Sequence, residues 1–169
     1  MARMRAPSHR PAALFTALAA GAALAVALAS EAWGGLVPCA LCLVERWPYR
    51  LAIGLGVLAL ILPRGLGRAV LWLAVLAVLA GAVAAGVHVG VEFGWWPSPL
   101  PECAAPHFVA GSIAQRLASM PALPSKPCDS PTYLIPGLPV SMAAMNLIYA
   151  LVFAVLLGSA LERSQGRRR

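Results

Sequence analysis

The chain has 169 residues, of which 60% are hydrophobic and only 11% are charged, and its formal net charge is +7. A soluble domain of this size does not need so many apolar residues to fill one core, so the composition excludes an ordinary soluble protein and predicts an integral membrane protein. Nucleic-acid binding is not favoured either, because the arginines lie in short tails and one tight turn instead of on one folded face.

Four apolar segments are candidates for membrane-spanning helices, which need roughly 17 to 25 residues. They cover about residues 12–29, 47–62, 69–91 and 139–161. The second is the weakest, because Arg50 leaves a short uncharged run and has to snorkel outward from the helix start. The sequence therefore predicts an all-α membrane protein, one domain over residues 1–169, folded as a four-helix transmembrane bundle with external loops at about 30–46 and 92–138.

A cleaved signal peptide is an alternative for the first segment. Arg3, Arg5 and Arg10 precede it, and "ALAS" ending at Ser30 resembles a small-residue cleavage site. The apolar run is longer than the core of about 7 to 15 residues that such peptides have. We therefore expect the first segment to be a retained helix, which also gives an even number of spans.

Most basic residues fall on one side of the predicted bundle. Nine of the thirteen lie at the N-terminus, between the second and third spans or in the C-terminal tail, and they are Arg3, Arg5, Arg10, Arg64, Arg68, Arg163, Arg167, Arg168 and Arg169. Because positive charge marks the cytoplasmic side, both termini are expected in the cytoplasm and both long loops outside it.

All four cysteines then lie in the external loops, which indicates an oxidising compartment. Cys39 and Cys42 stand three residues apart in "PCALCLVER", at or just ahead of a predicted helix N-terminus. A disulfide between such close residues stabilises little, whereas C-x-x-C places a thiolate beside a resolving thiol. This pair is therefore interpreted as redox-active.

Arg46 follows Cys42 by four residues, which is one turn if the segment is helical. Its permanent charge can lower a thiol pKa or hold an oxygen-bearing ligand, and we favour this role over snorkelling to headgroups. Pro48 leaves open whether Cys42 and Arg46 share one helix, because proline prefers the first helical turn.

Cys103 and Cys128 are far from each other and from the first pair, and no second C-x-x-C follows, so no metal site is expected. A structural disulfide between them would staple the Pro-rich loop and contribute roughly 3 kcal/mol. Prolines flank both cysteines and predict an extended, accessible chain.

Two further features lie outside the cysteine motifs. Within "HFVAGSIAQRLASM", apolar residues at helical spacing predict a short amphipathic helix: Val109, Ile113, Leu117 and Met120. His88 lies near the outer end of the third span and is expected to be a buried, hydrogen-bonded histidine instead of a ligand.

The chain resembles the disulfide bond formation protein B (DsbB) family, bacterial inner-membrane thiol:quinone oxidoreductases. The likeness rests on the four spans, "PCALCLVER" opening the second, "PSPLPEC" after the third and "PCDSP" before the fourth. The resemblance implies that a reduced, thioredoxin-fold DsbA-like oxidase attacks Cys103 and releases Cys128. It further implies that Cys128 attacks Cys39 and releases Cys42 toward a membrane quinone, either ubiquinone or menaquinone.

The resemblance also implies that Arg46 is the family arginine at the quinone site and that the cysteine loops face the periplasm. His88 is not carried over, because its spacing from Cys103 differs from that expected for the family histidine. Two other functions compete with this one: a quinone-linked enzyme similar to vitamin K epoxide reductase, whose C-x-x-C is expected in the last helix, and a non-catalytic membrane scaffold with one loop disulfide.

Overall fold

The structure is a computed structural model that describes residues 9–103, 112–118, 126–135 and 137–166. Over these ranges the chain is helical and contains no strand. Three helices are long and apolar enough to cross a membrane: α1 (Arg10–Ala32), α4 (Arg64–Glu92) and, over Met142–Ser164, α6 (Met142–Gly166). The prediction of an all-α protein with membrane-spanning segments is confirmed at this level.

The remaining predicted span corresponds to α3 (Arg46–Ile61), a helix of 16 residues that falls short of the usual spanning length. Pro48 lies in its first turn, where the missing N–H removes no helical hydrogen bond. Arg50 is exposed, as expected, and its guanidinium lies 5.1 Å from the centroid of the Trp47 ring.

The helix ends differ from the predicted bounds where charged or capping residues lie. α4 begins at Arg64 instead of residue 69, because a membrane helix continues into the interface, where an arginine stays solvated. α6 begins at Met142 instead of residue 139. Its start is fixed by Ser141, whose Oγ accepts a hydrogen bond from the backbone N–H of Ala144 at 3.2 Å.

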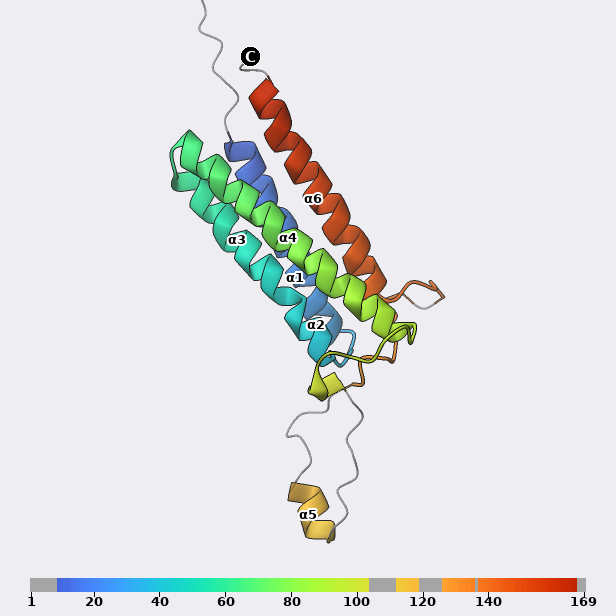
Figure 1. The fold of residues 1–169 in the computed structure, drawn as a ribbon. Helices are drawn as coiled ribbons and strands as arrows, with labels where there is room; N and C mark the ends of the chain where they lie inside the picture. Colours follow the sequence, from blue (N-terminus) through green and yellow to red (C-terminus); the bar gives the residue numbers. More distant parts are fainter. Residues whose placement is uncertain (1–8, 104–111, 119–125, 136, 167–169) are drawn as a thin grey trace, which may run out of the picture.

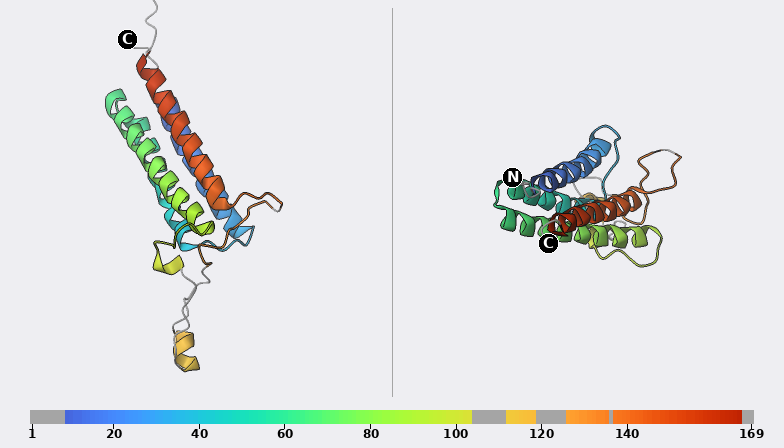
Figure 2. Two further views of the ribbon diagram at one scale, coloured as in Figure 1. Left: turned by 45° about the vertical axis from the view of Figure 1, so that its right-hand side comes forward. Right: turned by 90° about the horizontal axis from the view of Figure 1, so that it is seen from above.

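The four long helices run alongside one another (Figures 1 and 2). α3 packs against both α1 and α4, and α6 packs along α4, whereas α1 and α6 contact each other at only a few points. Small residues allow these close approaches: a Cβ on Gly56 of α3 would lie 2.9 Å from the backbone nitrogen of Ala17 in α1. In the described residues, the seam between α1 and α6 is therefore only loosely packed.

Short helices lie between the long ones. α2 (Ala40–Val44) leads into α3, and the 3-10 turn η1 (Pro101–Cys103) contacts α2 at the same end of the molecule (Figure 1). The predicted amphipathic helix is confirmed in its middle part by α5 (Ile113–Ala118), and the rest of the predicted segment lies outside the described residues.

Candidate functional site

The first cysteine pair lies at the start of α2, as the sequence predicts. Cys39 is the N-cap of the helix and Cys42 lies within it. Their Sγ atoms are 2.8 Å apart, and the backbone N–H of Cys42 donates to Sγ of Cys39 at 3.2 Å. Cys39 is buried and Cys42 is half-buried, and both are free thiols. The helix start therefore holds two sulfurs within reach of each other.

This arrangement gives the two thiols different acidities. The hydrogen bond between the two thiols, together with the Cys42 backbone N–H, lowers the pKa of Cys39 although burial acts in the opposite direction. The same thiol bond and burial raise the pKa of Cys42. Cys39 is therefore the cysteine that ionises first in the reduced pair.

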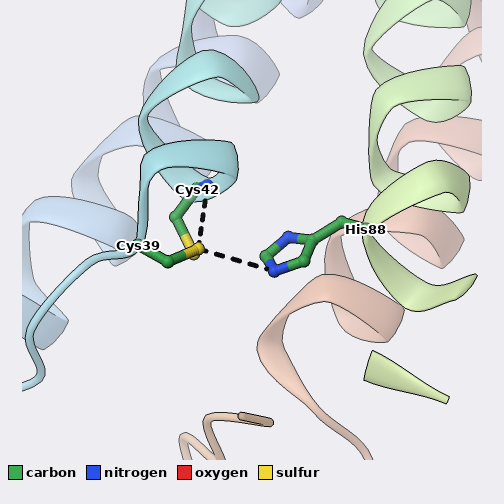
Figure 3. A group of neighbouring side chains, drawn as sticks. All are labelled: Cys39, Cys42 and His88. Carbon is green, nitrogen blue, oxygen red and sulfur yellow. Dashed lines mark hydrogen bonds between the residues drawn. The ribbon is translucent and has the colours of Figure 1, made fainter. Parts of the chain in front are cut away.

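His88 reaches the cysteine pair from α4 (Figure 3). Its Nε2 lies 3.5 Å from Sγ of Cys39, and its Nδ1 lies 2.6 Å from Oε1 of Glu45. A carboxylate only accepts hydrogen bonds, so Nδ1 carries the proton and the lone pair of Nε2 faces the sulfur. The expectation of a buried, hydrogen-bonded histidine is confirmed, since His88 is 3% exposed.

Glu45 connects α4 and α6 to the break between α2 and α3. It lies between α2 and α3, and its second oxygen, Oε2, accepts a hydrogen bond from Nδ2 of Asn146 in α6 at 2.6 Å. The hydroxyl of Tyr49 donates to Oδ1 of the same Asn146 at 2.6 Å. Sequence reasoning missed Glu45 as a site residue. The available signals were an acid next to Arg46 in an apolar stretch and one asparagine in an uncharged span.

Arg46 is the first residue of α3, while Cys42 belongs to α2, so the two do not share a continuous helix. The break falls at Glu45, earlier than Pro48. The guanidinium of Arg46 pairs with the carboxylate of Glu31 at the end of α1, and the residue is 8% exposed. Its Nε is buried and has no hydrogen-bond partner among the described residues.

A cavity of about 290 Å³ lies in the seam between α1 and α6. Its walls are mostly apolar and come from α1 (Ala22, Ala23, Leu24, Val26, Ala27) and α6 (Met142, Ala143, Met145). Its polar groups come from the residues just described: Cys42, Glu45, Arg46, Tyr49 and Asn146. The cavity therefore offers an apolar molecule direct access to one sulfur of the pair.

The second cysteine pair forms a disulfide between Cys103 and Cys128. The two residues are 4% and 1% exposed, and they pack in one cluster with Cys39, Leu41 and Val91. The expectation of an extended, accessible chain around them is wrong: η1 ends at Cys103, and the apolar contacts of the disulfide fold the loop onto α2 and α4. The structure thus brings all four cysteines to one end of the molecule.

The chain matches the family model described as "Disulfide bond formation protein DsbB" over residues 9–160, which is most of its length. No curated protein and no solved structure matches the chain significantly. The matched range contains both cysteine pairs, Arg46 and His88, together with the three candidate membrane spans except for the end of α6. The chain therefore belongs to the DsbB family, whose members are membrane oxidoreductases of disulfide bond formation.

Proposed function

We propose that this protein is a thiol:quinone oxidoreductase of the bacterial inner membrane that reoxidises a periplasmic, thioredoxin-fold DsbA-like oxidase. The observation that carries the proposal is the position of Cys42. It belongs to a pair that packs against the Cys103–Cys128 disulfide, and it also lines the apolar cavity beside Arg46. The Cys39–Cys42 pair thus packs against the loop disulfide and also lies beside a site for an apolar electron acceptor.

Thiol–disulfide exchange carries the electrons inward. A thiolate of the reduced partner attacks Cys103, and the Cys103–Cys128 bond breaks to release Cys128 as a thiolate. Cys128 then attacks Cys39 of an oxidised Cys39–Cys42 pair and releases Cys42. The second partner thiol displaces Cys103, which attacks Cys128 and restores the loop disulfide. The partner leaves oxidised, and Cys39 and Cys42 hold the two electrons as thiols.

Access to Cys103 requires a local opening of the loop, because both loop cysteines are buried. The apolar cluster that covers them is small, and it also contains Cys39 of the first cysteine pair. Docking of the partner would replace part of this covering. The burial therefore protects the loop disulfide from thiols that do not bind to the loop.

The cavity has features that fit a quinone. Its walls are apolar, as an isoprenoid-bearing ring requires, and the buried, unpartnered Nε of Arg46 is a donor that a ring oxygen would satisfy. A bound quinone would supply the acceptor for two electrons and two protons. The guanidinium of Arg46, held by Glu31, would position that acceptor next to Cys42.

The residues around the thiols support the final oxidation. Cys39 ionises first and lies next to Sγ of Cys42, so it is placed to close the disulfide as Cys42 gives up its electrons. Nε2 of His88 is placed to take the Cys39 proton, and Glu45 stabilises the resulting imidazolium. Glu45 also lines the cavity, so this proton path ends where protons are consumed.

A membrane-dissolved oxidant explains why these thiols lie beside an apolar cavity. DsbA has a potential near −120 mV, so a couple at about −200 mV would reoxidise it only against roughly 80 mV, or about 4 kcal/mol for two electrons. An ordinary thiol partner therefore cannot drive the reaction, whereas a quinone can.

The same proposal includes the membrane topology: a four-helix transmembrane bundle in which α3 also spans, with both termini in the cytoplasm. α2 and η1, which carry the two cysteine pairs, lie at one end of the helices, and Arg64 and Arg68 begin α4 at the other (Figure 1). The positive-inside rule assigns the arginine end to the cytoplasm and the cysteine end to the periplasm.

The test follows the absorbance of a ubiquinone and of a menaquinone analogue with purified protein and a reduced DsbA-like partner. Wild type should reduce at least one quinone, Cys42→Ser should not, and Ser164→Ala, at the other end of α6, should behave as wild type. Absence of turnover by folded wild type with both quinones would contradict the proposal and favour the scaffold. Reduction of vitamin K epoxide without partner oxidation would favour the other redox enzyme.

A further inference from the structure

We propose that Cys39, Cys42 and His88 form a binding site for a thiophilic divalent metal, of which Zn²⁺ is the best match, when the cysteine pair is reduced. The sequence predicts no zinc site, because that prediction uses only the spacing of the cysteines. The third ligand comes from α4, 49 residues away from Cys39 in the chain. The proposal goes beyond the proposed function, since it requires only that the two thiols be reduced.

The donor atoms already lie close to the positions that a metal requires. The two sulfurs and a ring nitrogen of His88 are all within 4.8 Å of one another (Figure 3). Around tetrahedral Zn²⁺, with Zn–S of about 2.3 Å and Zn–N of about 2.0 Å, a sulfur and a nitrogen stand about 3.5 Å apart and two sulfurs about 3.8 Å apart. Cys39 Sγ and His88 Nε2 are 3.5 Å apart, and only the sulfurs, now at 2.8 Å, have to separate.

His88 is oriented as a metal-binding histidine. A ligating histidine usually donates its other ring N–H to a carboxylate or carbonyl, which fixes the tautomer and makes the free nitrogen more basic. Glu45 fills this role at 2.6 Å from Nδ1, and it is held in turn by Asn146 at 2.6 Å. The lone pair of Nε2 therefore points at the sulfurs before any metal arrives.

The charge balance also favours a divalent metal. On binding, each thiol loses a proton and forms one bond to the metal, so two protons are released and two thiolates neutralise the charge of Zn²⁺. All three ligands belong to buried or half-buried residues, where a neutral complex avoids the cost of an unpaired charge. Three protein ligands leave the fourth position for water, as in zinc sites that are not purely structural.

Metal binding and oxidation exclude each other at this site. When an oxidant such as diamide or the proposed quinone takes two electrons from the bound pair, the S–S bond forms, both metal–sulfur bonds break and Zn²⁺ is released. The metal therefore holds the pair in its reduced form and blocks its reoxidation. Under the proposed function, such a site makes the enzyme sensitive to periplasmic zinc at the step after electrons have reached Cys39 and Cys42.

The experiment uses the full chain in lipid nanodiscs with Cys103→Ser and Cys128→Ser, so that only Cys39 and Cys42 supply thiols. Co²⁺ added to the reduced protein, without quinone or partner, should give the near-ultraviolet charge-transfer absorption of thiolate–cobalt bonds, at one equivalent per chain. Zn²⁺ should abolish it by displacement. Diamide, which takes up two electrons and two protons, should also abolish it and release the metal.

Variants identify the third ligand. Glu45→Gln should weaken metal binding by about 10- to 100-fold, and His88→Ala by more. His88→Cys should keep tight binding with stronger charge-transfer absorption, which a variant that merely failed to fold would not show. His9→Gln, at the opposite end of the bundle, should bind as the parent does. No charge-transfer absorption in the reduced protein, equal binding by the oxidised protein, or unchanged affinity in His88→Ala would each overturn the proposal.

Discussion

The carboxylate of Glu45 lies 2.6 Å from Nδ1 of His88, and the two residues are 6% and 3% exposed. The same carboxylate accepts a hydrogen bond from Asn146, so one acidic residue at the break between α2 and α3 fixes α4 and α6. This carboxylate is the only direct link between the histidine next to the thiols and the polar end of the cavity among the described contacts.

Replacing Glu45 with Ala should destabilise the fold. It leaves donors of His88 and Asn146 buried without partners, at about 1 to 3 kcal/mol each. We expect the thermal unfolding midpoint in detergent to fall by at least about 4 °C for a chain of this size. The unfolding midpoint of Glu45→Gln should fall less, because reorientation of the side-chain amides can satisfy the hydrogen bonds of both His88 and Asn146. Equal midpoints for wild type and Glu45→Ala would show that the network does not contribute to stability.

The lowered pKa of Cys39 predicts a change in its pH-dependent reactivity. In a chain with Cys103→Ser and Cys128→Ser, Cys42→Ala removes the thiol whose hydrogen bond with Sγ of Cys39 lowers the pKa of Cys39. Because the thiolate is the reactive form, the pH of half-maximal alkylation by iodoacetamide should move to higher values. Cys42→Ser keeps an O–H donor and should move the midpoint less. A midpoint that stays constant in Cys42→Ala would refute this account of the acidity.

Arg46→Lys should weaken quinone binding without disturbing the partner. A lysine keeps the charge but loses the planar set of donors, including the unpartnered Nε. Loss of one charge-assisted hydrogen bond, about 1.5 to 3 kcal/mol, corresponds to an increase in KM for quinone of roughly 10- to 100-fold. KM for the DsbA-like partner should stay within about twofold.

Arg50→Lys is the matched control for this measurement. Arg50 lies in the next turn of the same helix, but it is exposed and its guanidinium lies over the Trp47 ring. In Arg50→Lys, KM for quinone and KM for the DsbA-like partner should both remain at wild-type values. If Arg46→Lys and Arg50→Lys behave alike, Arg46 does not hold the quinone.

The two loop cysteines should behave differently toward the partner. In Cys128→Ser, Cys103 is the loop sulfur that can hold the partner covalently. The test uses a DsbA-like protein with a single active-site cysteine, which is first activated as a mixed disulfide. Its reaction with Cys128→Ser should yield a covalent complex. Non-reducing electrophoresis should show this complex, and dithiothreitol should remove it. Cys103→Ser should form far less of it. A stronger complex with Cys103→Ser would reverse the assigned order of attack.

Gly56 should not tolerate a side chain. A Cβ at this position would lie 2.9 Å from the nitrogen of Ala17 and 3.1 Å from the oxygen of Ala13, so α1 and α3 would have to separate. Gly56→Ala should cost about 1 to 3 kcal/mol, as overpacking does elsewhere. Gly54→Ala in the same helix meets no atom within 4 Å and should be neutral or slightly stabilising. Thermal unfolding of the two variants compares them directly.

Local patterns in the sequence were enough to predict the helices and the first cysteine pair. Uncharged runs identify α1, α4 and α6 because apolar residues of that number have few alternatives to a membrane helix. The C-x-x-C spacing predicts a thiol pair at a helix start, and the structure places Cys39 at the N-cap. The bounds were less exact, because Arg64 and Ser141 act at helix ends through solvation and capping.

The surroundings of the thiols could not be predicted, because they depend on packing between distant segments. His88, Glu45 and Asn146 come from different parts of the chain and meet only when α3, α4 and α6 are in place. For Cys103 and Cys128, the local preference of prolines for an open chain was overridden by burial of the disulfide against Leu41 and Val91. No spacing rule contains that information.

The short length of α3 has a consequence for the lipid around this protein. Sixteen residues of helix measure about 24 Å, whereas the hydrocarbon layer is about 30 Å thick. Under the proposed topology the bilayer has to thin near α3, or α2 has to complete the crossing. Either way, acyl-chain length would set how deep the Cys42 sulfur lies relative to the quinone ring, so the lipid itself would tune the rate of electron transfer.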